Sequence, residues 1–267
     1  MEVSVIIPTY RPGSYIYDCL QSVLNQDFSS EKFEIVIVLN GERNPYFDEI
    51  NSYFKNKRVN YRLLYTNQKG VSFARNLALD NLKSEYVVFL DDDDILTVNF
   101  ISGLFSKISF ETIVVSNLKT FVTDLDCLGS DYMNRSFIKC KNRHKFSLFS
   151  YRGFLSSACA KMIPFEVINS FRFDTNLSLD EDSLFMFVIS CNVNTIKLSE
   201  ESVIYYRRLR DGSASHEKLS FKVRIRNLLQ NQVKYSIVFF SGFGKYNFLF
   251  YISRLAATLK YYIFYSK

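Results

Sequence analysis

The first ninety residues alternate short apolar runs with segments whose apolar residues recur at helical spacing. The runs have the length and the β-branched and aromatic content of strands, and they lie at residues 3–8, 33–40, 59–65 (a weaker one) and 85–90. The segments between them include residues 13–26 and 70–82, and Ser72 could cap the second of these helices. Continuous apolar strands separated by helices predict an α/β protein with a mostly parallel sheet covered on both faces.

The pattern weakens beyond residue 100. We expect a strand at 112–117, a strand running into a helix at 159–170, a loop feeding a helix at 173–190, and a strand followed by a Gly/Ser loop at 201–216. Residues 124–150 are polar and irregular and predict only short helical pieces. The chain therefore reads as one large domain with a C-terminal appendage.

Composition narrows the class of protein. With 48% hydrophobic and 22% charged residues, the 267-residue chain has the balance of a folded globular protein. Its five cysteines are scattered and its two histidines isolated, a pattern that argues against a zinc site and favours a reducing compartment. The opening MEVSVIIPTY has no basic region and its apolar run ends at Pro8, so we expect no signal peptide and a cytoplasmic protein.

Four consecutive carboxylates, Asp91 to Asp94, follow the strand predicted at 85–90. Adjacent carboxylates repel and a buried unpaired charge is costly, so a positive group must lie beside them. One interpretation is a solvated turn or a helix cap, and Asp94 in front of residues 95–105 suits a cap. The other is a divalent cation at the carboxyl end of a strand, where Mg²⁺ or Mn²⁺ completes its shell with phosphates. The second interpretation predicts a nucleoside diphosphate ligand, held where the first, second and fourth strands end.

Five motifs occur in an order that is informative: VSVIIPTY, LNGE, GVSFARN, FLDDDD and DED. In order and spacing they resemble inverting family 2 glycosyltransferases with the GT-A fold, over residues 2–215 and most sharply over 2–95. The resemblance implies a hexosyl- or N-acetylhexosaminyltransferase of bacterial surface-polysaccharide synthesis. It implies a catalytic domain at 1–215, divided into a nucleotide-binding half at 1–100 and an acceptor-side half at 101–215, followed by a helical extension at 216–267.

The resemblance also implies roles for individual residues. Asp91, Asp92 and Asp93 would form the D-x-D element, in which Asp93 coordinates Mn²⁺ or Mg²⁺ and Asp91 faces the ribose, the sugar or the metal. The other donor-binding residues implied are Pro8, Thr9 and Tyr10 around the nucleoside, Arg75 at the base or the phosphates, and Asp92 within the acidic turn. For Arg75 the alternative is a solvated helix residue.

The chain departs from the family pattern after its second strand. Many members carry Asp-Asp-Gly there, with an Asp that reads uracil, whereas this chain has Leu39-Asn40-Gly41. Asn40 can still offer a base both a donor and an acceptor, so a UDP-sugar stays the expected donor although the identity of the base is open. The alternative is that Asn40 and Gly41 form a plain turn.

Inversion needs a general base that takes the proton from the acceptor hydroxyl, and the resemblance gives this role to Asp182. Asp180 and Glu181 adjoin it, and mutual repulsion should raise the pKa of one of these carboxyls. The alternative is that this cluster caps a helix. The three arginines at 207, 208 and 210 could approach a phosphate, but we favour a solvated basic edge for them.

Positive charge is concentrated at the C-terminus. Residues 203–267 carry 12 Lys and Arg against 2 Asp and Glu, a net +10, whereas residues 1–202 carry 21 against 25, a net −4. Residues 247–263 place an apolar stripe on one helical face (Phe248, Ile252, Leu255, Leu259 and Ile263), while Arg254 and Lys260 oppose a membrane span. We expect an amphipathic helix that docks on the anionic inner face of the cytoplasmic membrane, near a lipid-linked oligosaccharide acceptor. The alternatives are packing on the domain and a homodimer formed through this helix.

Two other functions compete with glycosyl transfer to a glycan acceptor. A sugar nucleotidyltransferase also pairs carboxylates with a metal, but residues 8–14 make a poor Gly-rich activating loop. A non-catalytic, membrane-associated glycan-binding or scaffold protein on a degenerate transferase fold is the second. Nucleic acid is not an expected partner, because the predicted crevice is acidic.

Overall fold

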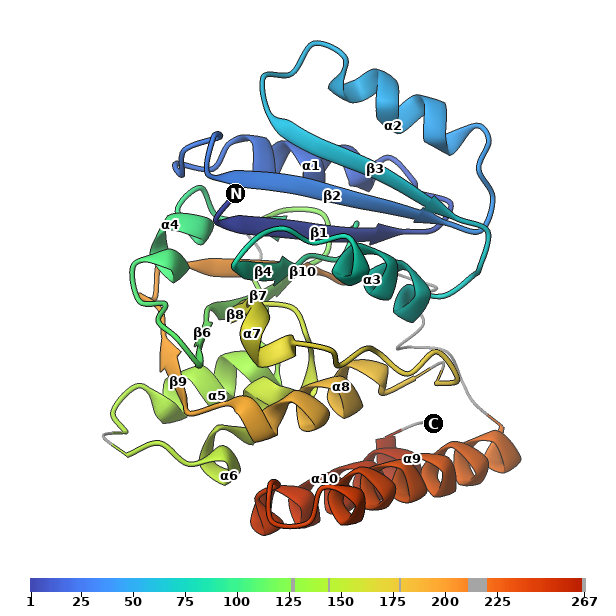
Figure 1. Ribbon diagram of the computed structural model, residues 1–267, viewed down its shortest axis with the longest axis vertical. Coiled ribbons are helices and arrows are strands. Elements are labelled where there is room, and N and C mark those ends of the chain that lie inside the picture. The colour runs from blue at the N-terminus through green and yellow to red at the C-terminus, as the bar shows by residue number, and fades with distance from the viewer. Residues whose placement is uncertain (126–127, 144, 178, 211–219, 266–267) are drawn as a thin grey trace.

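A seven-stranded sheet runs through the protein in the computed structural model, which describes residues 1–125, 128–143, 145–177, 179–210 and 220–265. The strand order is β3-β2-β1-β4-β8-β6-β9, and α3 lies in front of the sheet while α1 lies behind it (Figure 1). Strand β8 is antiparallel to β4 and β6, and the other pairs are parallel. The predicted mixed, mostly parallel α/β sheet is confirmed. Its strands are β1 (Val3–Thr9), β2 (Phe33–Asn40), β3 (Asn60–Thr66), β4 (Tyr86–Phe89), β6 (Thr112–Val115), β8 (Lys161–Pro164) and β9 (Thr195–Leu198).

The apolar runs of the sequence become the centre of this sheet. Every residue of β1 and β2 is buried, as expected for parallel strands covered on both faces. Pro8 lies inside β1 and does not end it, which corrects the sequence-based boundary. Strand β4 pairs with β1 only as far as Ile6, so Pro8 has a strand neighbour on one side only, where a missing N–H is tolerated.

A second sheet, β5-β10-β7, was not predicted as such. It comprises β5 (Ile95–Leu96), β7 (Asn117–Phe121) and β10 (Ile204–Arg208). Strand β5 directly follows the four aspartates and pairs antiparallel with β10. This pairing carries the basic end of β10 to the acidic turn, although the two are more than 100 residues apart in sequence.

The helices expected within residues 13–26, 70–82, 159–170 and 173–190 are present, whereas α2 was not predicted and the expected helical extension contains two helices. They are α1 (Tyr15–Leu24), α2 (Tyr46–Phe54), α3 (Val71–Asp80), α4 (Phe100–Phe105), α5 (Tyr132–Cys140), α6 (Leu148–Tyr151), α7 (Phe165–Ile168), α8 (Glu181–Ile189), α9 (Phe221–Ser241) and α10 (Phe248–Lys260). Helix α3 begins after Gly70, whose φ of +129° suits glycine. Ser72 is therefore not the cap that the sequence suggested; it is buried inside the first turn.

Helices α9 and α10 form a hairpin along one side of the sheet domain, next to α8 (Figure 1). Within the described ranges, no helix combines the length and the apolar character that a membrane crossing requires. The expected boundary between residues 215 and 216 falls outside the described residues, so the division into domains stays a prediction.

Candidate active site

The four aspartates of the acidic turn have four different environments, because the turn crosses the ends of β1 and β10. Asp92 accepts a hydrogen bond from the Thr9 hydroxyl. Asp93 pairs with Arg210, with Nε 2.5 Å from Oδ2. Asp94 is buried and accepts from the Tyr205 hydroxyl at 2.6 Å and from the backbone N–H of Arg208 at 2.8 Å.

Asp94 does not cap a helix, which corrects that part of the sequence analysis. The residues after it form β5, and α4 starts only after Asn99. Burial, together with the charges of Asp91 and Asp93, raises the pKa of Asp94. The positive groups expected beside the acidic turn are arginine side chains. Two of them are Arg208, at the end of β10, and Arg210, two residues after it. The three arginines of the predicted basic edge all form ion pairs, Arg207 with Asp131, Arg208 with Asp18 and Arg210 with Asp93. A purely solvated edge is therefore the wrong interpretation, although Arg210 stays exposed.

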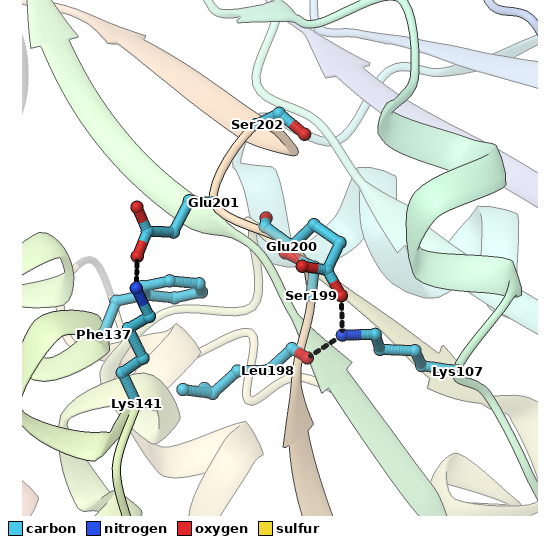
Figure 2. Close-up of a pocket in the computed structure, with 8 residues that line it drawn as sticks. All are labelled: Lys107, Phe137, Lys141, Leu198, Ser199, Glu200, Glu201 and Ser202. Atoms are coloured by element: carbon cyan, nitrogen blue, oxygen red, sulfur yellow. Dashed lines mark hydrogen bonds and ion pairs between the residues drawn. The ribbon is translucent and has the colours of Figure 1, made fainter.

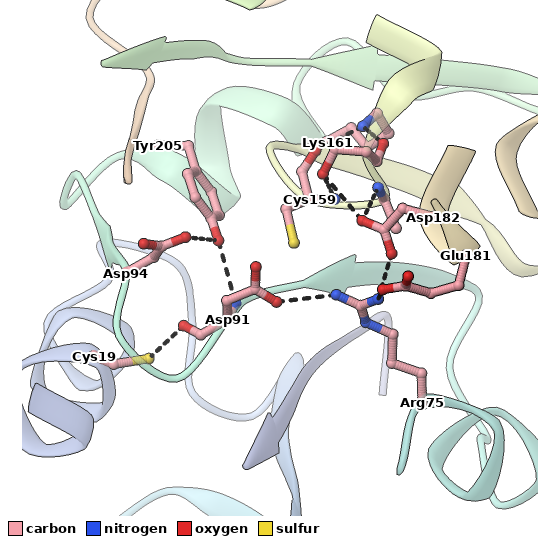
Figure 3. Close-up of polar contacts among 11 residues, drawn as sticks. Cys19, Arg75, Asp91, Asp94, Cys159, Lys161, Glu181, Asp182 and Tyr205 are labelled. Atoms are coloured by element: carbon pink, nitrogen blue, oxygen red, sulfur yellow. Dashed lines mark hydrogen bonds and ion pairs between the residues drawn. The ribbon is translucent and has the colours of Figure 1, made fainter. Parts of the chain in front are cut away.

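Arg75 connects the acidic turn to the start of α8 (Figure 3). It projects from α3, is 2% exposed, and lies with Nη2 3.0 Å from Oδ1 of Asp91, while Nη1 contacts the carboxylate of Asp182. Burial opposes the charge of Arg75, yet Asp182 and Asp91 raise its pKa above the ordinary value. The alternative of a solvated helix residue is excluded.

Asp182 accepts hydrogen bonds from three donors, which leaves it acceptor capacity. Besides Arg75, the backbone N–H of Ala158 donates to its Oδ2 at 2.9 Å and the Ser157 hydroxyl at 3.2 Å. Lys161 fixes the loop that contains Ser157 and Ala158, because its buried ammonium donates to the carbonyls of Ser157 and Cys159 at 2.5 and 2.6 Å. Burial lowers the pKa of Lys161 to about 8.

Two carboxyls of the acidic cluster at residues 180–182 have a raised pKa, whereas the sequence analysis expected one: burial raises the pKa of Asp180, and Glu181 is raised as well. Burial and the charge of Asp182 raise the pKa of Glu181 to about 7. Helix α8 begins at Glu181, but Asp180 in front of it adopts a left-handed conformation and makes no side-chain cap. Simple helix capping is thus the wrong interpretation of this acidic cluster.

The raised pKa of Glu181 predicts a pH-dependent effect on stability. The folded protein holds this proton more tightly than the unfolded chain does, so its contribution is greatest below pH 4.5 and is lost as the pH rises to about 7. Glu181→Gln should therefore raise the free energy of unfolding by about 1–3 kcal/mol at pH 8 and by less at pH 5. Urea unfolding at both pH values measures this; an equal change at both would contradict the assignment.

The part of the site that the sequence analysis expects to bind the nucleoside is built from the ends of β1 and β2. The Asn40 amide donates to the carbonyl of Thr9 at 2.8 Å, and its oxygen accepts from the backbone N–H of Gly70 at 3.0 Å. Asn40 is thus more than a turn residue, because it ties the end of β1 to the start of α3. Gly41 has φ +87°, and a Cβ there would lie 2.6 Å from the ring of Tyr10, so the turn requires glycine.

The expected site residues converge. Thr9 contacts both Asn40 and Asp92, Pro8 lies buried beside Thr9 in β1, and Tyr10 follows with its ring 41% exposed. Sequence reasoning missed Tyr205 and Lys161. Lys161 could have been noticed, since it is a lone lysine in an apolar run; nothing local marks Tyr205, whose hydroxyl also accepts from the backbone N–H of Asp91 at 3.2 Å.

The residues present fit a divalent cation that takes part of its shell from a ligand. Among the described residues, no three His, Cys, Asp or Glu side chains are grouped as a self-sufficient metal site. Asp91 is 42% exposed at its side chain and Arg75 contacts only its Oδ1, while Asp93 is held by a single arginine. Mg²⁺ and Mn²⁺ commonly bind through one or two carboxylates and complete their shell with phosphate oxygens and water.

A separate pocket of about 610 Å³ lies away from this site (Figure 2). It is lined by Lys107, Phe137, Lys141 and residues 198–202. Its charged side chains pair with one another, Lys107 with Glu200 at 2.6 Å and Lys141 with Glu201. These pairs neutralise the lining, and we assign the pocket no role.

The fold is that of GT-A glycosyltransferases. The chain superimposes on residues 1–349 of Staphylococcus aureus TarS in complex with UDP-GlcNAc, with a TM-score of 0.75 and 21% identity. The match covers 98% of this chain and 73% of the TarS chain. A mannosyltransferase from Pyrobaculum calidifontis in complex with GDP-Man and Mn²⁺ gives a TM-score of 0.66 at 16% identity, over 99% of this chain and 70% of the other. The predicted fold class is confirmed.

The chain belongs to glycosyl transferase family 2, whose model matches residues 4–168. It is 28% identical to the glycosyltransferase GlyA of Streptococcus pneumoniae over 80% of this chain and 31% of GlyA. It is 26% identical to the poly(ribitol-phosphate) beta-N-acetylglucosaminyltransferase TarS of S. aureus over 79% of this chain and 36% of TarS. The chain thus spans about a third of the length of these relatives.

Proposed function

We propose that the protein is an inverting, metal-dependent glycosyltransferase that moves a sugar from a nucleotide-sugar to a hydroxyl of a glycan acceptor. One observation carries the proposal: an unbroken series of contacts links Asn40, Thr9 and the acidic turn to Arg75 and Asp182. Donor-binding loops and a candidate base therefore form one unit. A UDP-sugar is the favoured donor, since a relative with the same fold is known in complex with UDP-GlcNAc.

In this proposal Asp182 accepts the proton of the acceptor hydroxyl while that oxygen forms a bond to the anomeric carbon. The bond between this carbon and the phosphate oxygen breaks, and the nucleoside diphosphate leaves with the electron pair. Asp93 and Asp91 would hold a divalent cation, whose charge offsets the charge that develops on the leaving group. Arg75 contacts both Asp91 and Asp182 and so fixes the position of one carboxylate relative to the other. Its direct contact with the donor stays a prediction.

A thermal-shift screen of UDP-, GDP- and dTDP-sugars with Mn²⁺ tests donor binding, because a ligand that prefers the native state raises its stability. We expect a UDP-sugar to give the largest shift. If none of these donors shifts the transition with Mn²⁺ present, nucleotide-sugar binding is contradicted.

Arg210 should compete with the cation, because its guanidinium occupies the carboxylate of Asp93. The pair is partly exposed, so screening weakens it. We expect Arg210→Gln to strengthen the binding of Mn²⁺ alone by up to about fivefold. Electron paramagnetic resonance of free Mn²⁺ measures this directly, with Arg11→Gln, whose partner is the exposed Glu42, as the matched control. Weaker Mn²⁺ binding in Arg210→Gln would contradict the competition.

The acceptor that we propose is a lipid-linked oligosaccharide in the synthesis of a bacterial surface polysaccharide, used at the cytoplasmic membrane. The support is the basic C-terminus and the similarity to relatives that act on teichoic acid, such as TarS. Removal of the lipid from such an acceptor should raise its KM.

A further inference from the structure

The α9–α10 hairpin turns its apolar residues toward solvent. In α9 they recur every three or four residues along one face. In α10 the stripe found in the sequence also faces outward except for Leu255, which is partly buried and packs against the core. The outward side chains are 36–63% exposed: Ile225, Leu229, Val233, Ile237 and Phe240 in α9, and Phe248, Ile252 and Leu259 in α10, with Ile263 just after it.

The inner faces of the two helices attach the hairpin to the domain through buried aromatic side chains and through polar contacts. Arg254 is buried and donates to the Ser183 hydroxyl at 3.0 Å. The Tyr235 hydroxyl lies 2.7 Å from the same Ser183 hydroxyl, and the Asn231 amide donates to Asp180 at 3.4 Å. Packing on the domain therefore accounts for the inner side of the hairpin and leaves most of the outward apolar side chains uncovered.

The charge around the stripes has one sign. Residues 218–267 contain nine Lys and Arg and no Asp or Glu. Lys222 and Arg226 are exposed, and each precedes a residue of the stripe, Ile225 or Leu229, by three positions and so lies on the same face. The outward side of the hairpin thus combines exposed apolar side chains with the exposed positive charges of Lys222 and Arg226.

We propose that this outer face docks in the interfacial region of an anionic lipid bilayer. Apolar side chains of such a helix enter the boundary between headgroups and acyl chains, and neighbouring lysines and arginines attract acidic headgroups. A second copy of the chain fits less well, since a symmetric contact would bring two basic faces together without an acidic partner from residues 218–267. Docking of this face would place the proposed enzyme on the membrane. The docking itself does not depend on catalysis.

The docked hairpin would also fix the position of the catalytic centre. Asp180 and Ser183, which the inner face contacts, flank Asp182 in sequence. Docking would therefore hold the base-bearing end of α8 on the membrane side of the domain, where a lipid-linked acceptor is presented.

Flotation with vesicles tests the proposal on the whole chain. We expect recovery with vesicles of phosphatidylcholine and phosphatidylglycerol, little with phosphatidylcholine alone, and a fall as NaCl increases. Ile237→Ser with Phe240→Ser should lower the partition coefficient at least about tenfold. Lys222→Gln with Arg226→Gln should lower it about thirtyfold. The matched controls are Phe110→Ser and Lys55→Gln with Lys57→Gln, which alter exposed residues elsewhere.

Two results would overturn the proposal. One is equal recovery with anionic and neutral vesicles, or no recovery with either. The other is a concentration-dependent dimer in light scattering that Ile237→Ser with Phe240→Ser abolishes, which would assign the face to a second copy. Donor binding measured on the same samples keeps a failure of docking distinct from a failure of the proposed glycosyl transfer.

Discussion

Asp182→Asn should lower kcat by at least about a hundredfold while donor affinity stays within a few fold of the original. The amide keeps the shape of the side chain, and its oxygen can still accept from the backbone N–H of Ala158. It cannot take up a proton from the acceptor hydroxyl. Steady-state transfer measures kcat, and calorimetry with the donor measures binding. This separates an enzyme from a scaffold, in which donor and acceptor would bind without turnover.

Glu181→Gln is the necessary comparison, because Glu181 adjoins Asp182 and its pKa is raised to about 7 by burial and by the charge of Asp182. If Asp182 is the base, the Glu181 variant keeps most of its turnover. Unchanged turnover in Asp182→Asn together with a large loss in Glu181→Gln would transfer the role to Glu181. The effects on kcat, not on donor affinity, decide between the two carboxylates.

Much of the crevice could be predicted from local sequence. Continuous apolar runs identify parallel strands, and residues at the ends of such strands meet at one edge of the sheet. This rule predicts that Thr9, Asn40 and the acidic turn lie together, and the structure confirms that Thr9 contacts both of the others.

The long-range partners could not be predicted, because periodicity carries no information about which side chains meet across the fold. Arg75 and Asp182 are 107 positions apart, and Arg210 reaches Asp93 only because β10 pairs with β5. The sequence therefore showed that the carboxylates needed a positive group beside them, for which a metal was one interpretation, but it did not show that arginines lie there. The stripe of α10 illustrates the same limit: its residues were identified correctly, but a helical period does not say which face meets the core.

Asp93→Ala should abolish the Mn²⁺ dependence of nucleoside diphosphate binding, with a loss of at least about a hundredfold in the affinity measured with Mn²⁺. Asp93 is the carboxylate that we propose as the principal protein ligand of the cation, and alanine offers no oxygen to replace it. Calorimetry with UDP in the presence and absence of Mn²⁺ measures the effect. Asp27→Ala, which removes an exposed carboxylate elsewhere, is the matched control.

The same variant frees Arg210, which loses its partner at Asp93. A released guanidinium can bind a diphosphate directly, so we expect residual UDP binding that is the same with and without Mn²⁺ and that falls with added salt. The double variant Asp93→Ala with Arg210→Gln should lose this remaining UDP binding as well. Full Mn²⁺ dependence in Asp93→Ala would show instead that the cation is held without Asp93, leaving Asp91 as the carboxylate of the acidic turn to test next.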